Sequence, residues 1–499
     1  MTQMLSLAEL LAHPLMGMWS VDGGDQEHAG VLSFDAGVVY LTLYFAIDGN
    51  AVMGSGWRTD PALVLFLAPN QPTVHGRTKA GQVTLFNCAE LNYQSTNRLS
   101  PPSTQIELTL RPTQAWIGDG FVKPEQTYKE LSFEASGLHN VLSTVRVDHQ
   151  FLVKSTRKHK SVTHRLKVLT GAQQAFLVYD HERPHAVATN LGKQYNIVFS
   201  STVAQSHSAT GGSSFATTDE VLIGSEGASL PELMSVSYQL EQFLSIMCLG
   251  PFRATRLRVR LDIVHTAQLL WTLGRAQKAV SFVSMPHQIL VPLGQHPQLA
   301  SRAIETWFKA SNIRRLARWL IFESLFEETT STAKFLSIAQ AWEIIGREED
   351  KSALYDRKLF KKACDAAAKA IKAHLGSNAA DRLVQLLRSS NRQSFATFVK
   401  NITGKVPALA LSEICGDVEQ FVSFVVKTRN VLTHMQGNKK FSLEMASYFS
   451  LFLTYKLTAL FCIHECTSLG LPLDNLAGML ANNEMARFAR RPLPSLMTF

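Results

Sequence analysis

The stretch DVEQFVSFVVKTRNVLTHMQG, residues 417–437, decides how the second half of the chain folds. Asp417 followed by Gln420 is typical of a helix start, because the aspartate side chain accepts a hydrogen bond from a backbone N–H of the first turn. Gly437 suits the left-handed position just past a helix end. Between these two signals lies an apolar stripe that predicts a helix with one buried face: Val418, Phe421, Val422, Val425 and Leu432.

A second face of this predicted helix is polar and carries Ser423, Lys427, Asn430 and His434. Residues spaced by three or four positions lie on one side of a helix. Arg429 lies about 100° round the helix from Asn430, and its long side chain reaches this face. His434 falls in the last turn, where the negative end of the helix dipole favours a protonated imidazole.

Arg429, Asn430 and His434 together suit phosphate chemistry that needs no metal ion. A guanidinium stays charged and binds phosphate through two hydrogen bonds, an imidazole transfers protons near neutral pH, and an amide orients either of them. The same residues also fit an ordinary helix end with a surface arginine and a solvent-facing asparagine. The spacing alone does not decide, because RLDIVH, residues 260–265, repeats it in a predicted strand. Positions five apart in a strand face opposite sides, so Arg260 and His265 are not expected to meet.

Outward from this helix, the period of the apolar residues divides the chain near residue 300. In later segments apolar residues recur every three or four positions, which predicts helices, as in Phe335, Ile338, Trp342 and Ile345. Earlier segments alternate apolar and polar residues, which predicts strands, as in Val39, Leu41, Leu43 and Phe45. We therefore predict an α+β chain, with a β-rich, antiparallel, sandwich-like N-terminal domain and an all-α helical bundle behind it. The predicted boundaries are 1–300, a linking helical region at 301–330, a helical domain at 331–485 and a tail at 486–499.

The charge of the chain favours an anionic partner. Its 499 residues carry a formal net charge of +9, which suits RNA, DNA or a membrane surface. Two basic groups are candidates for following an RNA backbone: Lys154, Arg157, Lys158 and Lys160 in one run, and Arg256, Arg258 and Arg260 on one face of a predicted strand. A solvated loop and a solvated sheet face are the alternatives, because no aromatic residues interleave these cations to stack bases.

Cysteine usage and hydropathy predict a reduced cytoplasmic protein without a membrane span. The six cysteines are too sparse for a disulfide framework, and Cys462 and Cys466 lack further ligands at zinc spacing, so no metal site and no cofactor are expected. Residues 1–15 lack the basic start of a signal peptide. The most apolar stretch, residues 448–466, contains Lys456 and His464 and is predicted to be a core helix.

Several motifs resemble a known family. Arg429, Asn430 and His434 match the HEPN superfamily pattern of an arginine, commonly an asparagine directly after it, and a histidine four to six residues on. FLSIAQAWEIIGR, 335–347, resembles the opening helix of ApeA-type HEPN domains, with Glu343 as its acidic residue, although Gly346 replaces a usual polar residue. Three further segments resemble the rest of the ApeA-type chain: GMWSV at 17–21 with GVLSFD after it, HGRTKAGQVTLFNC at 75–88, and ETWFKASNIRRLARWLIF at 305–322.

The resemblance implies a bacterial anti-phage, abortive-infection protein with a C-terminal, metal-independent HEPN endoribonuclease domain. Arg429, Asn430 and His434 are then the catalytic residues. Glu343 either supports them by orienting Arg429 or forms a structural ion pair, and Lys427, on the polar face of the same helix as Arg429, is a further supporting candidate. The implied partners are RNA, with tRNA as one candidate, a second copy of the chain bound through the HEPN domain, and a phage-derived trigger. The alternative is a non-catalytic sensor or RNA-binding protein that uses the HEPN domain for dimerisation. A carbohydrate-binding role for the β-rich domain also stays open.

Overall fold

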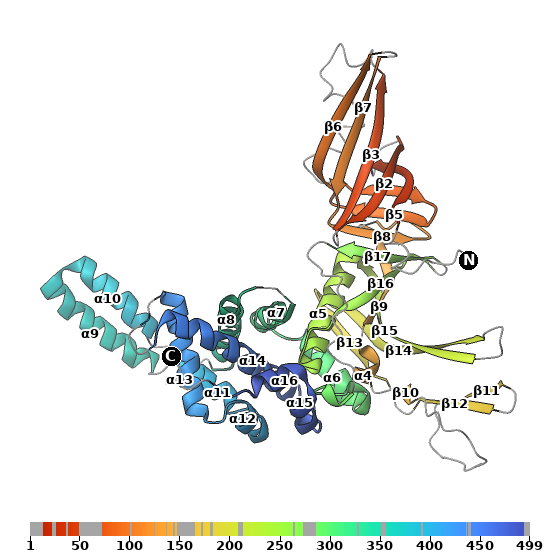
Figure 1. The fold of residues 1–499 in the computed structure, drawn as a ribbon. Coiled ribbons are helices and arrows are strands. Elements are labelled where there is room, and N and C mark those ends of the chain that lie inside the picture. Colours follow the sequence, from red (N-terminus) through yellow and green to blue (C-terminus); the bar gives the residue numbers. More distant parts are fainter. Residues whose placement is uncertain are drawn as a thin grey trace. The chain divides into compact units, whose positions relative to one another are not determined.

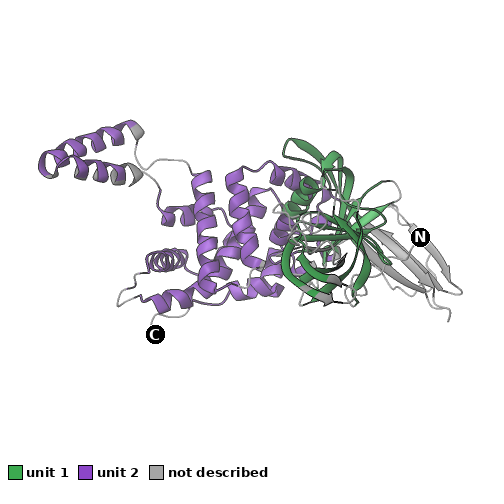
Figure 2. Ribbon diagram, turned by 90° about the horizontal axis from the view of Figure 1, so that it is seen from above, with its two compact units in different colours: residues 1–138, 185–240, 253–280 green, residues 139–184, 241–252, 281–499 purple. Residues whose placement is uncertain are grey.

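The computed structural model describes most of the chain: residues 13–21, 26–35, 38–48, 72–99, 102–123, 125–135, 137–142, 145–146, 165–170, 173–179, 183–207, 213–262, 265–272, 286–326, 329–350, 356–390, 393–435, 437 and 441–493. The chain divides into two compact units, coloured separately in Figure 2. Unit 1 comprises Met1–Leu138, His185–Leu240 and Arg253–Val280. Unit 2 comprises His139–Pro184, Glu241–Phe252 and Ser281–Phe499. These units are not consecutive segments, so the predicted linear boundaries stay predictions.

Unit 1 is built on one large antiparallel sheet (Figure 1). Within the described residues its fourteen strands follow the order β13-β14-β15-β9-β16-β17-β8-β5-β4-β1-β2-β3-β7-β6. Neighbouring strands pair antiparallel throughout, as predicted for a β-rich first half. The strands are β1 (Leu15–Val21), β2 (His28–Asp35), β3 (Val38–Asp48), β4 (Val74–Thr78), β5 (Gly81–Phe86), β6 (Ala89–Leu99), β7 (Pro102–Arg111), β8 (Gln114–Gly118), β9 (Thr127–Ala135), β13 (His185–Asn190), β14 (Lys193–His207), β15 (Ser213–Ser229), β16 (Ala254–Arg260) and β17 (Thr266–Thr272).

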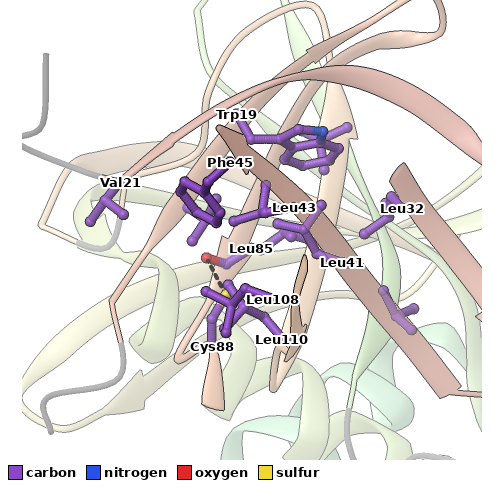
Figure 3. Close-up of a cluster of buried hydrophobic side chains, with 14 of the residues drawn as sticks. Trp19, Val21, Leu32, Leu41, Leu43, Phe45, Leu85, Cys88, Leu108 and Leu110 are labelled. Atoms are coloured by element: carbon purple, nitrogen blue, oxygen red, sulfur yellow. Dashed lines mark hydrogen bonds between the residues drawn. The ribbon is translucent and has the colours of Figure 1, made fainter. Parts of the chain in front are cut away.

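One hydrophobic core of unit 1 lies on the inner face of its first strands (Figure 3). The alternation predicted for residues 39–45 is confirmed, because Leu41 and Leu43 are fully buried and pair with Leu110 and Leu108 of β7. Burying leucines in this way stabilises a sheet by roughly 1.5–3 kcal/mol per side chain. The alternating residues therefore hold β3 and β7 together.

Trp19 and Gly76 explain two of the motifs found in the sequence. They face each other across β1 and β4, and Trp19 is fully buried. A Cβ atom at position 76 would lie 2.3 Å from the Trp19 ring, so only glycine leaves room for the indole. The GMWSV and HGRTKAG segments are thus two sides of one packing contact.

Unit 2 is mainly helical (Figure 1). Its small sheet has the order β10-β12-β11, and α9 and α10 pack along one another. The strands are β10 (Val145–Arg146), β11 (Arg165–Thr170) and β12 (Gln173–Tyr179). The helices are α6 (Pro297–Phe308), α7 (Asn312–Phe326), α8 (Ser331–Glu349), α9 (Arg357–Leu375), α10 (Ser377–Ser390), α11 (Phe395–Thr403), α12 (Ala408–Ile414), α13 (Val418–His434), α14 (Leu443–Ser468), α15 (Leu476–Asn482) and α16 (Glu484–Ala489); α4 (Leu138–Leu142) and α5 (Leu230–Cys248) have residues in both units.

Helix α14 is the core of unit 2. Among the described helices it alone is long and apolar enough to cross a membrane, but 72 % of its most apolar window is buried inside the protein. It packs against α8, α13 and α16, and the Trp342 indole of α8 donates a hydrogen bond of 3.2 Å to the Leu457 carbonyl. The prediction of a core helix is confirmed. Cys462 and Cys466 are fully buried on it, and burial raises the pKa of both thiols.

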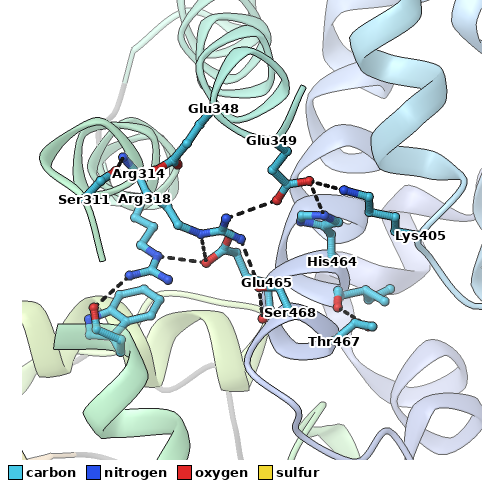
Figure 4. Close-up of polar contacts among 12 residues, drawn as sticks. Ser311, Arg314, Arg318, Glu348, Glu349, Lys405, His464, Glu465, Thr467 and Ser468 are labelled. Carbon is cyan, nitrogen blue, oxygen red and sulfur yellow. Dashed lines mark hydrogen bonds and ion pairs between the residues drawn. The ribbon is translucent and has the colours of Figure 1, made fainter. Parts of the chain in front are cut away.

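Buried charges tie α7 to α14 (Figure 4). The Glu465 carboxylate is fully buried, and it accepts hydrogen bonds from Arg314 at 2.6 Å and Arg318 at 2.8 Å. Burial opposes the charged form of Glu465, but the two guanidinium groups lower its pKa below the usual value. The Arg318 guanidinium also lies over the Trp307 ring at 3.7 Å.

A second carboxylate extends this network to α8 (Figure 4). Glu349 pairs with Arg314 at 3.1 Å, with Lys405 at 2.7 Å and with His464 at 3.4 Å. Burial would raise the pKa of Glu349, but the hydrogen bond and charge of His464, together with Lys405 and Arg314, lower it to about 2. The described residues hold no group of three or more histidine, cysteine or acidic side chains placed to bind a metal ion.

Candidate active site

Helix α13 begins as the sequence predicts and ends differently. Asp417 caps it, since its Oδ1 accepts a hydrogen bond of 2.9 Å from the Gln420 backbone N–H. The left-handed residue after the helix is Met435, with φ 52°, and not Gly437, so that prediction was wrong. Gly437 is needed for a different reason: a Cβ there would lie 2.9 Å from the backbone nitrogen of Leu443, where the chain enters α14.

The two faces of α13 are as predicted. Phe421, Val425 and Leu432 are buried in unit 2. Lys427, Asn430 and His434 are exposed on the other face, and Arg429 lies half-buried between the two faces. The tight turn at Met435 leaves His434 at the very end of the helix.

Arg429 is held by a residue 86 positions earlier in the chain. Its Nη2 donates to Oε2 of Glu343 on α8 at 3.1 Å, and its Nη1 donates to Oδ1 of Asn430 at 3.4 Å. The Arg429 side chain is 30 % exposed and the Glu343 side chain 21 %. A partly buried ion pair of this kind fixes the guanidinium while leaving part of it accessible.

Arg347 and Phe395 also belong to this cluster, and sequence reasoning missed them. Arg347 donates a second charged hydrogen bond to Glu343, from one turn along α8. The Phe395 ring, at the start of α11, lies 5.6 Å from the Arg429 guanidinium carbon, within cation–π range. The Glu–Arg spacing of four on a helix is a signal for the first contact, while nothing local in the sequence indicates the second.

Gly346 is the departure from the family pattern, and its neighbours explain it. A Cβ at position 346 would lie 2.4 Å from Cβ of Phe398, so α11 packs directly on the backbone of α8 at this point. The same close approach brings Phe395, one turn earlier, toward Arg429. A polar side chain at position 346 is therefore excluded by packing.

His434 and Lys427 complete the exposed face. His434 lies one helical turn after Asn430, and Lys427 lies one turn before it. The described residues offer the His434 ring no hydrogen-bond partner. An anion placed at this end of α13 thus meets a guanidinium held in position, an amide and an imidazole.

The other predicted cations lie elsewhere. Lys154, Arg157, Lys158 and Lys160 fall outside the described residues. In the strand face, Arg256 and Arg258 share the Glu134 carboxylate of β9, and Arg260 pairs with Glu130 at 3.3 Å. These carboxylates neutralise most of the arginine charge, which favours the alternative of an ordinary sheet face.

The second Arg–His pair, in RLDIVH, does not form a site. Strand β16 ends at Arg260 and does not continue toward His265 as the sequence predicted, because the Leu261 N–H donates to the His265 carbonyl at 3.0 Å and turns the chain. His265 hydrogen-bonds Asp262 at 2.6 Å, and this contact raises its pKa. Arg260 and His265 thus have different partners, as expected.

Two family models match this chain. A family model described as ApeA N-terminal domain 1 matches residues 14–290. This chain belongs to the ApeA family. A second model, Apea-like HEPN, matches residues 336–475 of this ApeA-type protein and takes in Glu343, Arg429, Asn430 and His434. No curated protein and no solved structure matches the chain.

Membership of the ApeA family supports a HEPN nuclease role in anti-phage defence, since HEPN domains are generally ribonucleases. The two matched regions correspond to the predicted order of a β-rich domain followed by a helical HEPN domain. Neither match tests individual residues, so Arg429, Asn430 and His434 of this ApeA-type protein remain candidate catalytic residues.

Proposed function

We propose that this protein is a metal-independent endoribonuclease that acts in bacterial anti-phage defence, in the cytoplasm. The observation that carries the proposal is the Arg429–Glu343 ion pair, which holds a guanidinium beside Asn430, one helical turn before His434, within the region matched by the HEPN model. Its substrate is RNA, with tRNA as one candidate, because the chemistry uses a neighbouring 2′-hydroxyl that DNA lacks.

The reaction is attack of a ribose 2′-oxygen on the adjacent phosphorus. The bond from phosphorus to the 5′-oxygen breaks, which leaves a 2′,3′-cyclic phosphate on one product and a 5′-hydroxyl on the other. His434 takes the proton from the 2′-hydroxyl or gives one to the leaving 5′-oxygen. Arg429 stabilises the negative charge that builds on the phosphorane oxygens, and Asn430 orients the phosphate.

Glu343 and Lys427 have supporting roles. Glu343 holds Arg429 by one oxygen and Arg347 by the other, so two guanidinium groups are kept at the edge of the site. Lys427 adds a positive charge on the exposed face one turn from Asn430. Both residues position or attract the substrate and exchange no proton with it.

A second copy of the chain supplies a second histidine in this proposal. Exposed apolar side chains lie at the end of α13 and along the helix that follows it: Met435 directly after His434, Leu443 at the start of α14, and Tyr448 and Leu451 further along α14. Apolar residues exposed in this density mark an association surface. Two copies paired there place two His434 side chains near one another, so that one acts as base and the other as acid.

The test compares His434→Ala and Arg429→Ala with wild type on total RNA in EDTA, with the end groups of the products mapped. Removal of a general acid or base, or of a charge that stabilises the transition state, is expected to slow cleavage about 100-fold or more. His265→Ala is the matched control, because that exposed histidine also follows an arginine by five positions.

Cleavage by His434→Ala at the wild-type rate would remove this site from the reaction. If the wild-type protein binds RNA without cutting it under any condition, the alternative holds, and the HEPN domain serves as a non-catalytic sensor or RNA-binding unit. Retention of both Arg429 and His434, with Arg429 held in place by Glu343, favours the enzyme.

A further inference from the structure

A pocket lined by arginines lies on unit 2, away from the candidate active site. Its volume is about 430 Å³, and its lining comes from the end of α12, from α15 and α16, and from the two residues after α16: Ser412, Glu413, Ala481, Arg487, Arg490 and Arg491. Three guanidinium groups face one carboxylate in this lining, so the pocket is cationic. A pocket of this composition suits a ligand that carries more than one negative charge.

Two of the three arginines of this pocket, Arg490 and Arg491, are held in place. Arg490 pairs with Glu413 at 2.5 Å and donates to the Leu480 carbonyl at 3.4 Å. The guanidinium of Arg491 lies 4.2 Å from the centre of the Phe488 ring. Fixed guanidinium groups bind phosphate at a lower entropic cost than mobile lysines do.

A buried lysine joins two of the short helices that line the pocket. Lys456 is buried, and its ammonium group donates hydrogen bonds to the carbonyls of Ile414 and Ala489. These carbonyls are the last of α12 and α16, so one buried cation joins the helix end that carries Glu413 to the helix end that carries the arginines, and it offsets the negative ends of both dipoles. The Phe488 ring is also stacked on Tyr455 of α14 at 5.1 Å.

The pocket and the candidate active site lie toward opposite ends of α13. Ser412 and Glu413 precede the start of α13 by a few residues, while Arg429 and His434 are at its C-terminal end. A helix of 17 residues is about 25 Å long. At about 3.4 Å per nucleotide of a stacked strand, this length corresponds to roughly seven nucleotides.

We propose that this pocket is a docking site for the phosphate backbone of the RNA substrate, several nucleotides away from the bond that is cut. Arg487 and Arg491 bind phosphate oxygens, and Arg490, held by Glu413 and the Leu480 carbonyl, adds its positive charge to the pocket. The guanidinium of Arg491, backed by Phe488, offers a flat surface on which a base stacks. The inference rests on the proposed function for the identity of the ligand, since RNA is the polyanion that reaches both places.

The experiment measures RNA binding separately from cleavage. Arg487→Glu together with Arg491→Glu is placed in a His434→Ala background, and its affinity for a labelled RNA of about 30 nucleotides is measured over a range of salt concentrations. We expect affinity to fall at least about tenfold, and the slope of log affinity against log salt to decrease by about two, one for each lost phosphate contact. The Arg487→Lys and Arg491→Lys pair is expected to recover the salt slope and only part of the affinity, because lysine keeps the charge without the planar surface.

The matched control is Arg302→Glu together with Lys309→Glu. It makes the same change of charge on two residues, Arg302 in α6 and Lys309 directly after that helix, and its affinity is expected to change by less than about threefold. With His434 intact, cleavage of a dinucleotide is expected to be the same in the pocket variant and in wild type, because a dinucleotide does not span α13.

The outcomes separate this inference from the proposed function. Loss of RNA binding in the pocket variant but not in the control supports the pocket even if the wild-type protein cuts nothing. RNA binding unchanged in the pocket variant overturns the pocket even if His434 proves catalytic. Binding of a free nucleoside monophosphate, with no effect of the variant on RNA, also overturns it.

Discussion

At the scale of single residues, Glu343 determines what Arg429 is able to do. An arginine at the end of a helix has many rotamers, and an ion pair to a neighbouring helix selects one of them. The structure gives Glu343 two such partners, Arg429 and Arg347. Replacement of the carboxylate therefore releases the guanidinium of Arg429 without removing its charge.

Glu343→Gln is expected to lower the rate of RNA cleavage about tenfold, which corresponds to about 1.4 kcal/mol of lost transition-state stabilisation. The loss is expected in kcat and not in KM. The Arg429 guanidinium keeps its positive charge and still attracts the substrate, but it is no longer fixed in one orientation. Steady-state kinetics on a defined RNA measure this. Glu419→Gln is the control, since it breaks an exposed ion pair of α13 with Lys400. Equal effects in the two variants would contradict a positioning role for Glu343.

At the scale of helices, unit 2 is joined by buried charge as well as by apolar contacts. Glu465 and Glu349 are each shared among several cations from α7, α11–α12 and α14, so a single lost carboxylate leaves more than one cation without its partner. Removal of one member of a buried ion pair commonly costs about 3–5 kcal/mol. This network lies on helices next to the candidate site and holds α8, which carries Glu343.

The stability of this helical region is expected to depend on the charge of Glu349. Its pKa is lowered to about 2 in the folded protein from an ordinary value of 4.5, so its stabilising contribution is complete above pH 4.5 and is lost as the pH falls from 4.5 toward 2. The contribution is on the order of 3 kcal/mol. Glu349→Gln is expected to have a lower Tm than wild type at pH 7, and the difference is expected to narrow below pH 4.5.

Differential scanning calorimetry of both proteins between pH 7 and pH 3 checks this dependence. Glu444→Gln is the control, because Glu444 is an exposed residue in the first turn of α14, and its Tm is expected to follow wild type throughout. A difference between Glu349→Gln and wild type that stays constant down to pH 3 would show that the carboxylate charge plays no part.

At the scale of the whole molecule, the proposed reaction needs a second copy of the chain. The exposed apolar residues of α14 are the argument for it, since Tyr448 is 42 % exposed and Leu451 43 %. Both lie on the outer face of α14, whose other side is the core of unit 2. One helix thus serves folding on one side and, in the proposal, association on the other.

Leu451→Glu is expected to convert a dimer into a monomer and to abolish cleavage, because dimerisation would bury the new carboxylate. The Tm of the variant is expected to be nearly unchanged, because position 451 is exposed in the single chain and tolerates a charge there. Light scattering after size exclusion measures the mass. Leu359→Glu is the control, as an equally apolar and more exposed residue on α9. A wild-type protein that is monomeric and fully active would contradict the proposed pairing.

The sequence by itself determined the order and the type of the elements. Apolar periods of two and of about 3.6 residues are local, so strand β3, helix α13 with its exposed Lys427–Asn430–His434 face, and the core helix α14 were all predictable. The Asp417 cap was local as well. The C-terminal end of α13 was not predictable from local sequence. The turn at Met435 and the close packing at Gly437 both depend on where α14 begins.

Only the tertiary structure decided which residues meet. Glu343 and Arg429 are 86 positions apart, and Arg314 and Glu465 are 151 apart, so no local pattern pairs them. The packing of Trp19 against Gly76 and the ion pair of Glu413 with Arg490 also join residues that are distant in the sequence. The periodicity of apolar residues predicts which face of a helix or strand is buried. Which other element packs on that face depends on the close packing of side chains from distant segments.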